Sequence, residues 1–163
     1  MASSDYLLKI DTIDGESTQK GHEKWLELQS WSWGESNAGS SGTGSGAGSG
    51  KVSMQDFHFV ISYGISSPKL FGACATGQHI PSGVLHIRKA GGDQQVFVEW
   101  KFTDILISSY QTGGSGHGGD VLPTDQVSFN FTKLEMEYKP QKKDGTLDAG
   151  IKFGYNIKTG TKV

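Results

Sequence analysis

The spacing of apolar residues constrains the fold of this chain more than any other feature, because they recur at every second position in nearly every ordered segment. A period of two is typical of strands that bury one face and expose the other. The pattern predicts strands over residues 6–11, 25–33, 52–63, 84–88, 96–107, 127–138 and 151–157. We therefore expect a mainly β protein.

Turn and capping residues separate the predicted strands. Asp14-Gly15, Gly91-Gly92-Asp93 and Asp144-Gly145 supply the positive φ that tight connections require, which favours antiparallel hairpins. One segment, 66–77, is predicted to be a helix, with a capping serine at Ser67, a proline at Pro68 and a terminating glycine at Gly77. Leu70, Phe71 and Cys74 would share the helix face that docks on the sheets, which makes Cys74 a small core residue rather than a nucleophile.

Four of the long predicted strands change phase partway along. The apolar set switches parity after Leu28, Met54, Phe102 and Phe131, and resumes at Trp31, Phe57, Ile105 and Leu134 respectively. A strict period of two changes parity only where a bulge inserts a residue or where the strand begins to bury its other face. The first explanation bends strands around a closing barrel, and the second implies a subunit interface. From the residues alone, both remain open.

Two segments consist of small residues and cannot contribute to a core. Residues 34–50 read GESNAGSSGTGSGAGSG, and residues 112–120 read TGGSGHGGD. A long connection inside a compact domain is uncommon unless it is functional or disordered. We interpret 34–50 as a flexible arm that becomes ordered against a partner, with a plain flexible linker as the alternative, and 112–120 as a wide turn.

Length and charge exclude several classes of protein. A chain of 163 residues fits one domain, predicted to span 1–163. With 15 Lys and Arg against 17 Asp and Glu, the net charge of −2 provides no basic field for nucleic acid or an anionic membrane. The single cysteine forms no internal disulfide, and no run approaches the ~18 apolar residues of a membrane helix. Residues 1–11 lack the basic start of a cleavable signal peptide, so we expect a protein made in the cytosol that leaves only through a dedicated machine.

The sequence offers no convincing catalytic, cofactor or metal site. The five histidines lack metal-ligand spacing, and the glycine run at 42–47 is followed by a predicted strand instead of the helix that a dinucleotide site needs. Ser115 and His117 lie two apart, but no nucleophile elbow surrounds the serine. Trp31, Trp33 and Trp100 alternate with polar residues as core aromatics do. A hydrolase built on Ser115 and His117, and a monomeric β-sandwich that binds glycans or proteins through its aromatic residues, are the alternatives to a structural protein.

An ordered set of short motifs covers nearly the whole chain. In sequence order, the motifs are Gly15-Glu16-Ser17, Trp31-Ser32-Trp33-Gly34, Gly50-Lys51-Val52, Gln55-Asp56, Ser67-Pro68, Ala73-Cys74, Gly77, Arg88-Lys89-Ala90-Gly91-Gly92, Ser108-Ser109, Thr112-Gly113-Gly114-Ser115-Gly116 and Tyr138-Lys139-Pro140-Gln141-Lys142. None is specific alone, but together they resemble the haemolysin-coregulated protein family, the tube subunits of type VI secretion systems.

The resemblance implies a two-sheet antiparallel β-barrel with one short flanking helix, assembled as a hexameric ring. Rings of that family stack into a hollow tube resembling a phage tail tube, which a contracting sheath expels together with its spike. The lumen of the tube carries or protects effector proteins, a role connected with virulence. The resemblance therefore implies self-assembly, sheath, spike and effector partners, no enzymatic activity, no cofactor and secretion without a cleavable signal peptide.

The resemblance also assigns roles to individual residues. Segment 34–50 corresponds to the family's extended loop that reaches toward the next ring, although its composition is more uniformly Gly and Ser than in some members. The residues assigned to ring stacking are Ser36, Asn37, Ser40, Ser41, Thr43, Ser45 and Ser49. Gln29 and Ser115 are the candidates for positions that face the lumen, where small polar side chains would hold cargo weakly.

Overall fold

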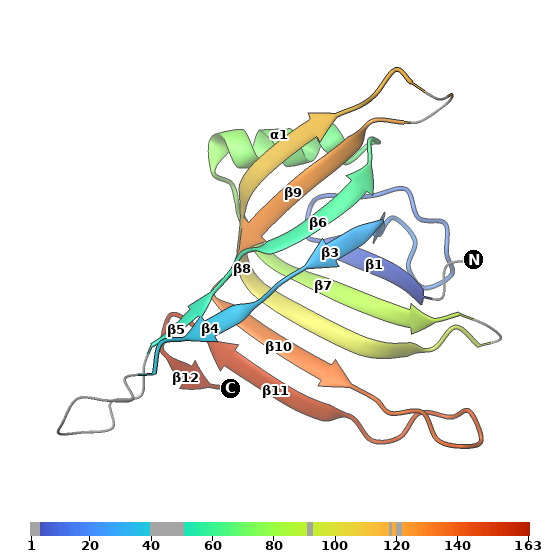
Figure 1. Ribbon diagram of the computed structural model, residues 1–163, viewed down its shortest axis with the longest axis vertical. Coiled ribbons are helices and arrows are strands. Elements are labelled where there is room, and N and C mark those ends of the chain that lie inside the picture. Colours follow the sequence, from blue (N-terminus) through green and yellow to red (C-terminus); the bar gives the residue numbers. More distant parts are fainter. Residues whose placement is uncertain (1–3, 40–50, 91–92, 118, 120–121) are drawn as a thin grey trace.

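A computed structural model describes residues 4–39, 51–90, 93–117, 119 and 122–163, and shows a mainly β fold with one short helix (Figure 1). The strands and helix in chain order are β1 Ser4–Ile10, β2 Leu26–Glu27, β3 Ser30–Ser32, β4 Glu35–Asn37, β5 Val52–Met54, β6 Phe57–Ser62, α1 Ser67–Thr76, β7 His79–Lys89, β8 Val96–Gly113, β9 Thr124–Asn130, β10 Lys133–Tyr138, β11 Ile151–Asn156 and β12 Thr161–Lys162. The prediction of a β fold with one helix is confirmed.

Ten of the strands form one antiparallel sheet, and β4 and β5 form a separate two-stranded ribbon. The order β12-β11-β10-β8-β7-β1-β2 makes the lower part of Figure 1, and the C-terminal half of β8 continues into β9, β6 and β3 in the upper part. The chain from Leu26 to Ser32 contacts both parts, because the Leu28 amide donates to the Tyr6 carbonyl (2.9 Å) and the Gln29 amide donates to the Val60 carbonyl (2.8 Å).

The four phase changes are bends around a single core. Residues on both sides of every change belong to or pack against the same buried cluster, so a second buried face is not what changes the parity. In β8 the change falls at Asp104, whose φ of 56° turns the strand sharply. The partner strand breaks opposite this point, between β9 and β10, where the Thr132 hydroxyl donates to an Asp104 carboxylate oxygen (2.8 Å). The subunit-interface interpretation of the phase changes is therefore wrong.

The centre of the core is a group of aromatic rings from the three strands β6, β8 and β9. Phe57, Phe59, Phe102 and Phe129 are at most 1% exposed. Phe129 lies 5.1 Å from Phe57 and 4.9 Å from Phe102, ring centroid to centroid, the second pair edge to face. These separations are in the favourable range for aromatic pairs. The rings fix the two parts of the sheet relative to each other.

Helix α1 differs from its prediction in two respects. Its cap residue is Ser66, which makes no side-chain capping bond, whereas Ser67 lies inside the first turn and donates its hydroxyl to the buried Asp125 of β9 (2.5 Å). The Asp125 carboxylate of β9 thus lies at the N-terminal end of α1, where the helix dipole is positive. Phe71 is 62% exposed, so its predicted place on the buried face was wrong. That face consists of Ser67, Leu70 and Ala73, with Cys74 half-buried beside the core.

Several boundaries also differ from the predicted ones. The structure begins β7 at His79, extends β8 to Gly113, divides the predicted strands at 25–33, 52–63 and 127–138, and adds β4 and β12. Gly15 was predicted to supply a positive φ, but Thr12 and Lys24 do so instead. Gly15 is needed for space, because a Cβ there would lie 2.4 Å from the Trp25 carbonyl oxygen. Gly145 does adopt a φ of 90°, whereas 91–92 lie outside the described residues.

Candidate functional site

The outer face of the upper part of the sheet carries small, uncharged residues in three cross-strand rows. The rows are Ser30-Val60-Gln126-Gln111, Ser32-His58-Ser128-Ser109 and Ser62-Thr124-Gly113. We call these residues the polar face. Their neighbours along the strands, such as Phe59 and Val127, point to the core. None of the three rows contains Asp, Glu, Lys or Arg, so this face binds through hydroxyl and amide groups rather than ionic charge.

A bulge in β8 organises one end of the polar face. Register with β9 shifts between Ile107 and Ser109, leaving Ser108 outside the ladder. The Ser108 hydroxyl donates to Asp56 (2.5 Å) and lies 2.8 Å from the Ser128 hydroxyl, which in turn lies 2.5 Å from that of Ser109. An open hollow of about 340 Å³ lies on the same face, lined partly by Trp31 and His58. The hollow is open and polar, which suits transient contacts better than an enclosed ligand site.

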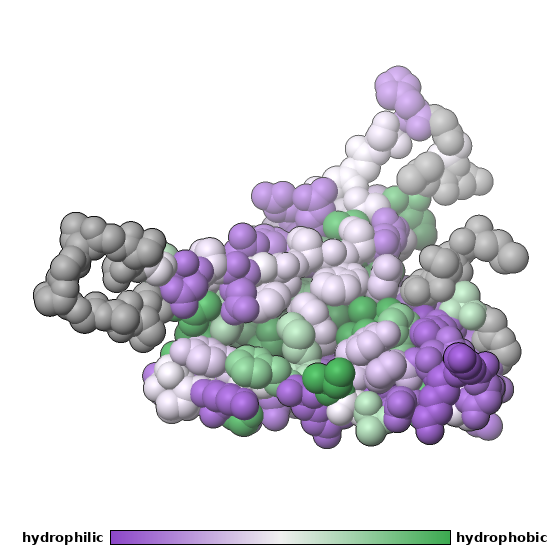
Figure 2. Space-filling view, turned by 60° about the horizontal axis from the view of Figure 1, so that its bottom comes forward, coloured by the Kyte–Doolittle hydropathy of each residue, from purple (hydrophilic) through white to green (hydrophobic). Residues whose placement is uncertain are grey.

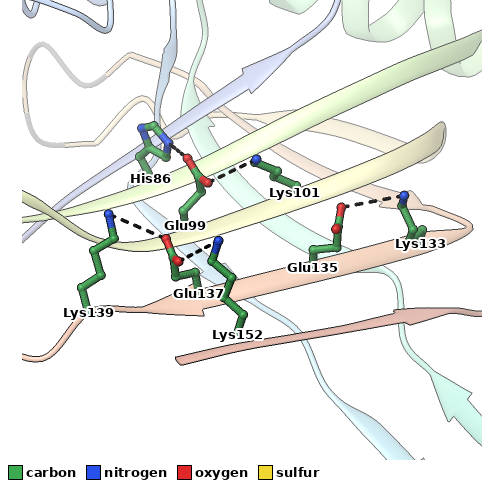
Figure 3. A network of polar contacts seen from close by, with 8 residues as sticks. All are labelled: His86, Glu99, Lys101, Lys133, Glu135, Glu137, Lys139 and Lys152. Atoms are coloured by element: carbon green, nitrogen blue, oxygen red, sulfur yellow. Dashed lines mark hydrogen bonds and ion pairs between the residues drawn. The ribbon is translucent and has the colours of Figure 1, made fainter. Parts of the chain in front are cut away.

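The outer face of the lower part is, by contrast, densely charged. Figure 3 shows the network formed by His86 on β7, Glu99 and Lys101 on β8, Lys133, Glu135, Glu137 and Lys139 around β10, and Lys152 on β11. Glu137 lies 3.2 Å from Lys152 and 3.8 Å from Lys139, and Glu99 lies 2.7 Å from His86 and 3.6 Å from Lys101. Burial opposes ionisation of Glu99, but the hydrogen bond with His86 and the nearby Lys101 hold the pKa of Glu99 below its usual range. Charges of both signs therefore lie within ion-pair distance of one another along β10.

Exposed apolar side chains gather in two other places. Tyr63, Ile65, Phe71 and Leu122 lie on and beside α1 and the start of β9. The second place is the inner side of β10 and β11. Along the cross-strand row Trp100-Met136-Phe153 the exposed fraction rises toward the edge of the sheet, from 9% at Trp100 to 56% at Phe153, and Ile151 is 70% exposed. Figure 2 shows hydrophobic residues on the face that includes this edge. Clustered apolar surface of this kind usually marks contact with another protein.

Comparison with known proteins decides the family. Residues 7–138 match the family model described as "Type VI secretion system effector, Hcp". The chain belongs to the Hcp family. It is 49% identical over 156 residues to Protein hcp1 of Pseudomonas aeruginosa. This alignment covers 94% of this chain and 95% of that protein. The haemolysin-coregulated resemblance is thereby confirmed.

Solved structures of Hcp proteins have the same fold. The structure of a type six secretion system protein superposes with a TM-score of 0.90 at 34% identity, covering 98% of this chain and 99% of that one. Hcp1 from Salmonella typhimurium superposes with a TM-score of 0.79 at 31% identity and the same coverage. The similarity therefore extends over the whole Hcp fold, including strands outside the matched range 7–138.

The residues predicted for function in this Hcp chain fall in separate places. Gln29, between β2 and β3, is exposed and donates its side-chain amide to the Ser62 hydroxyl of the polar face (2.8 Å). Ser115 is exposed on the connection after β8, where its hydroxyl accepts from the His117 amide (3.4 Å). No contact joins Gln29 to Ser115 within the described residues. The polar residues of this face occupy outward positions of β3, β6 and β9, which the alternation in the sequence indicates. The sequence did not predict that these strands lie side by side.

The predicted stacking arm of this Hcp protein is described only at its base. Ser36 and Asn37 lie in β4, where they pair with Ser53 and Val52 of β5 and are exposed. The sequence predicted no strand at this position. Ser40, Ser41, Thr43, Ser45 and Ser49 lie outside the described residues. Figure 1 places the β4–β5 ribbon at the edge of the molecule, away from α1.

Three histidines bond to other side chains: His22 to His86, His86 to Glu99 and His79 to Asp104. Within the described ranges, no group of three or more His, Cys, Asp or Glu side chains is placed to hold a metal ion. Among the same residues, no carboxylate bonds to His117. No helix in this part of the chain is both long enough and apolar enough to cross a membrane.

One cluster in this Hcp chain was missed from the sequence. His22 and Trp25, in the connection between β1 and β2, contact His86 of β7, which lies 64 residues from His22 in the chain. Neither histidine belongs to a recognisable sequence motif. Their contact depends on how the connection between β1 and β2 folds across the sheet, which the sequence did not predict. Trp25 is the one tryptophan outside the core, where it packs on both histidine rings.

Proposed function

We propose that this chain is a single-domain structural subunit of the type VI secretion tube, which closes into hexameric rings that stack around a channel. The contrast between the uncharged polar face and the charged face supports this role. A wall between two environments needs two different surfaces, and an uncharged lining would let a varied cargo pass without strong ionic binding. The charged face would be the outer wall, next to the contracting sheath.

The free edges of the upper sheet support a ring. In the described residues, β3 pairs only with β6, and β8 beyond Leu106 pairs only with β9. These two edges differ from each other, so pairing the edge of one copy with the other edge of the next is a head-to-tail contact. Repeated contacts of this kind form a closed ring when the rotation per copy allows it. The exposed apolar residues around α1 and on β10 and β11 would be covered by neighbouring copies.

A barrel within each subunit is the arrangement that best accounts for the segment from Leu26 to Ser32. It joins β1 to β6 by backbone hydrogen bonds, and the chain of paired strands then returns through β9, β8 and β7 to β1. A sheet that returns to its starting strand has fewer exposed edges, which leaves the remaining edges available for specific assembly.

The arm at 34–50 would mediate stacking between rings. The β4–β5 ribbon holds its base, with Ser36 and Asn37 exposed on β4. A Gly and Ser segment can lie flat and donate backbone hydrogen bonds without the permanent adhesion of an apolar contact. We propose that the subunit is exported in assembled form with the spike, and that it carries effector proteins in its lumen.

The lumen assignment predicts an effect of charge at two positions. Replacing Gln29 or Ser115 with lysine should leave the ring mass unchanged but reduce the amount of effector retained on purified rings at least about tenfold, or about 1.4 kcal/mol, because the channel would gain six unpaired charges. Gln78→Lys is the matched control, since Gln78 is an exposed glutamine whose side chain bonds to Thr12 and not to a residue of the polar face. Retention equal to that of the native protein would contradict the assignment of these positions to the lumen.

A further inference from the structure

The connection between β1 and β2 forms a strap over the outer face of the sheet. We define the strap as residues 11–25. It is braced internally, since the Gly15 amide donates to the Lys24 carbonyl and the Lys24 amide donates to the Ser17 carbonyl, both at 2.8 Å. Beneath it, Leu7 of β1 is only 1% exposed although it points away from the main core cluster. The strap therefore buries a small second apolar site.

A chain of polar contacts joins the strap to the sheet. His22, which is 8% exposed, places its Nε2 atom 2.9 Å from Nδ1 of His86, and Nε2 of His86 lies 2.7 Å from Oε2 of Glu99. The Trp25 ring packs against both imidazoles, with centroids 4.6 Å from His22 and 4.8 Å from His86. Arg88 adds a second link, donating to Asp5 (2.8 Å) and to Gln19 of the strap (2.6 Å).

The hydrogen-bonding pattern and the burial of His22 favour its neutral form. Because Glu99 is an acceptor when ionised, Nε2 of His86 carries a proton. When the other ring nitrogen of His86, Nδ1, accepts from Nε2 of His22, Nδ1 of His22 is left as an acceptor that is buried without a hydrogen-bond partner among the described residues. A proton added there creates a cation in an enclosed site, and Arg88, whose buried Nε also lacks a partner, stands close enough to repel it.

We propose that the strap is an acid-released latch, held on β1 and β7 by the neutral His22–His86 contact and freed when His22 takes up a proton. The charged and titratable groups that surround the contact are Asp5 on β1, Arg88 on β7, Glu99 and Lys101 on β8, Glu137 and Lys139 beside β10, and Lys20, Glu23 and Lys24 in the strap. Asp5 is already engaged by Arg88, and Glu99 by His86 and Lys101. Neither carboxylate is therefore free to compensate a charged His22. The Lys20 carbonyl and Glu23 favour the charged form, but burial, His86 and Arg88 outweigh them.

The direction of the pH effect follows from the environment of His22. Burial, followed by the neighbouring His86 and Arg88 side chains, lowers the pKa of His22 below its ordinary value of 6.5. The released strap, in which His22 is solvated, binds the proton more tightly than the closed form does. The latch is therefore fully closed above about pH 6.5 and weakens as the pH falls below that value. Release would expose Leu7 and the outer side of β1.

Hydrogen exchange tests the latch in the intact protein. We expect the protection factor of the Asp11 amide, which donates to the Ser82 carbonyl of β7 (3.1 Å), to fall by up to about tenfold per pH unit between about pH 6.5 and 5, since one proton is taken up on opening. The Val127 and Phe129 amides of β9 should change far less. In His22→Gln the pH dependence of strap protection should disappear, and in His117→Gln, a substitution at an exposed histidine, it should remain.

Two results would overturn the latch. One is strap protection in the native protein that does not change over this pH range, and the other is an equal decline in His22→Gln. Should His22→Gln fail to fold, an NMR titration of His22 in the native protein decides the matter by itself. A midpoint at or above pH 6.5 contradicts the latch, and a midpoint below it, accompanied by loss of strap protection, supports it.

Discussion

Replacing Phe129 with alanine is expected to lower the free energy of unfolding by about 3–5 kcal/mol. Phe129 is fully buried and contacts aromatic rings from β6 and β8, so the truncation removes its transfer energy and leaves a cavity where the two parts of the sheet meet. Urea unfolding of the native and variant proteins, followed by tryptophan fluorescence, measures the difference.

Phe71→Ala is the matched control for this prediction. The same side chain is removed, but Phe71 is 62% exposed on α1 and its one aromatic contact is with Tyr110. We expect a loss of about 0.5–1 kcal/mol. Comparable losses in the two variants would contradict the placement of α1, with Leu70 and Ala73 facing the core and Phe71 facing outward.

Proline in the C-terminal part of β8 is expected to separate assembly from folding. Gln111 and Thr112 are adjacent and exposed, and neighbouring residues of a strand direct their amides to opposite edges. Of Gln111→Pro and Thr112→Pro, one therefore removes an amide that bonds to β9, and the other removes an amide on the free edge.

The two proline variants should consequently behave differently. The free-edge variant should unfold close to the native midpoint but shift most of the protein from the ring mass to the mass of a single chain, because the pairing between copies loses a hydrogen bond and meets the proline ring. The other variant should lose stability within the subunit. If both variants kept the native ring mass and one of them had native stability, the free edge of β8 would take no part in assembly.

Much of the β structure could be predicted because alternation is a local property of the chain. The phase changes were also visible, but their cause was not. A sharp bend at Asp104 and a break at Thr132 change the parity of the apolar residues in the same way as a second buried face would. The two causes can be distinguished only when the position of the partner strand is known. The outward position of Phe71 was unpredictable for a related reason, since a short helix is amphipathic only relative to the surface on which it docks.

Part of the candidate site could likewise be predicted from the sequence, and part could not. The small polar residues of β3, β6 and β9 were readable one strand at a time, and Gln29 was singled out among their neighbours. That these strands lie side by side as one uncharged face depends on pairings between distant segments, such as Val60 with Gln126. The strap lacks any alternation, so the contact of His22 with His86 had no signal in the sequence. The family resemblance supplied the ring and the stacking arm, which no single chain displays.

The most direct test of the tube proposal is the mass of the native protein in solution. Light scattering on a size-exclusion column at physiological salt should give six times the chain mass of 17.5 kDa, which is about 105 kDa. A uniform peak at 17.5 kDa over the accessible concentration range would contradict ring assembly and favour a monomeric β-sandwich binding module instead.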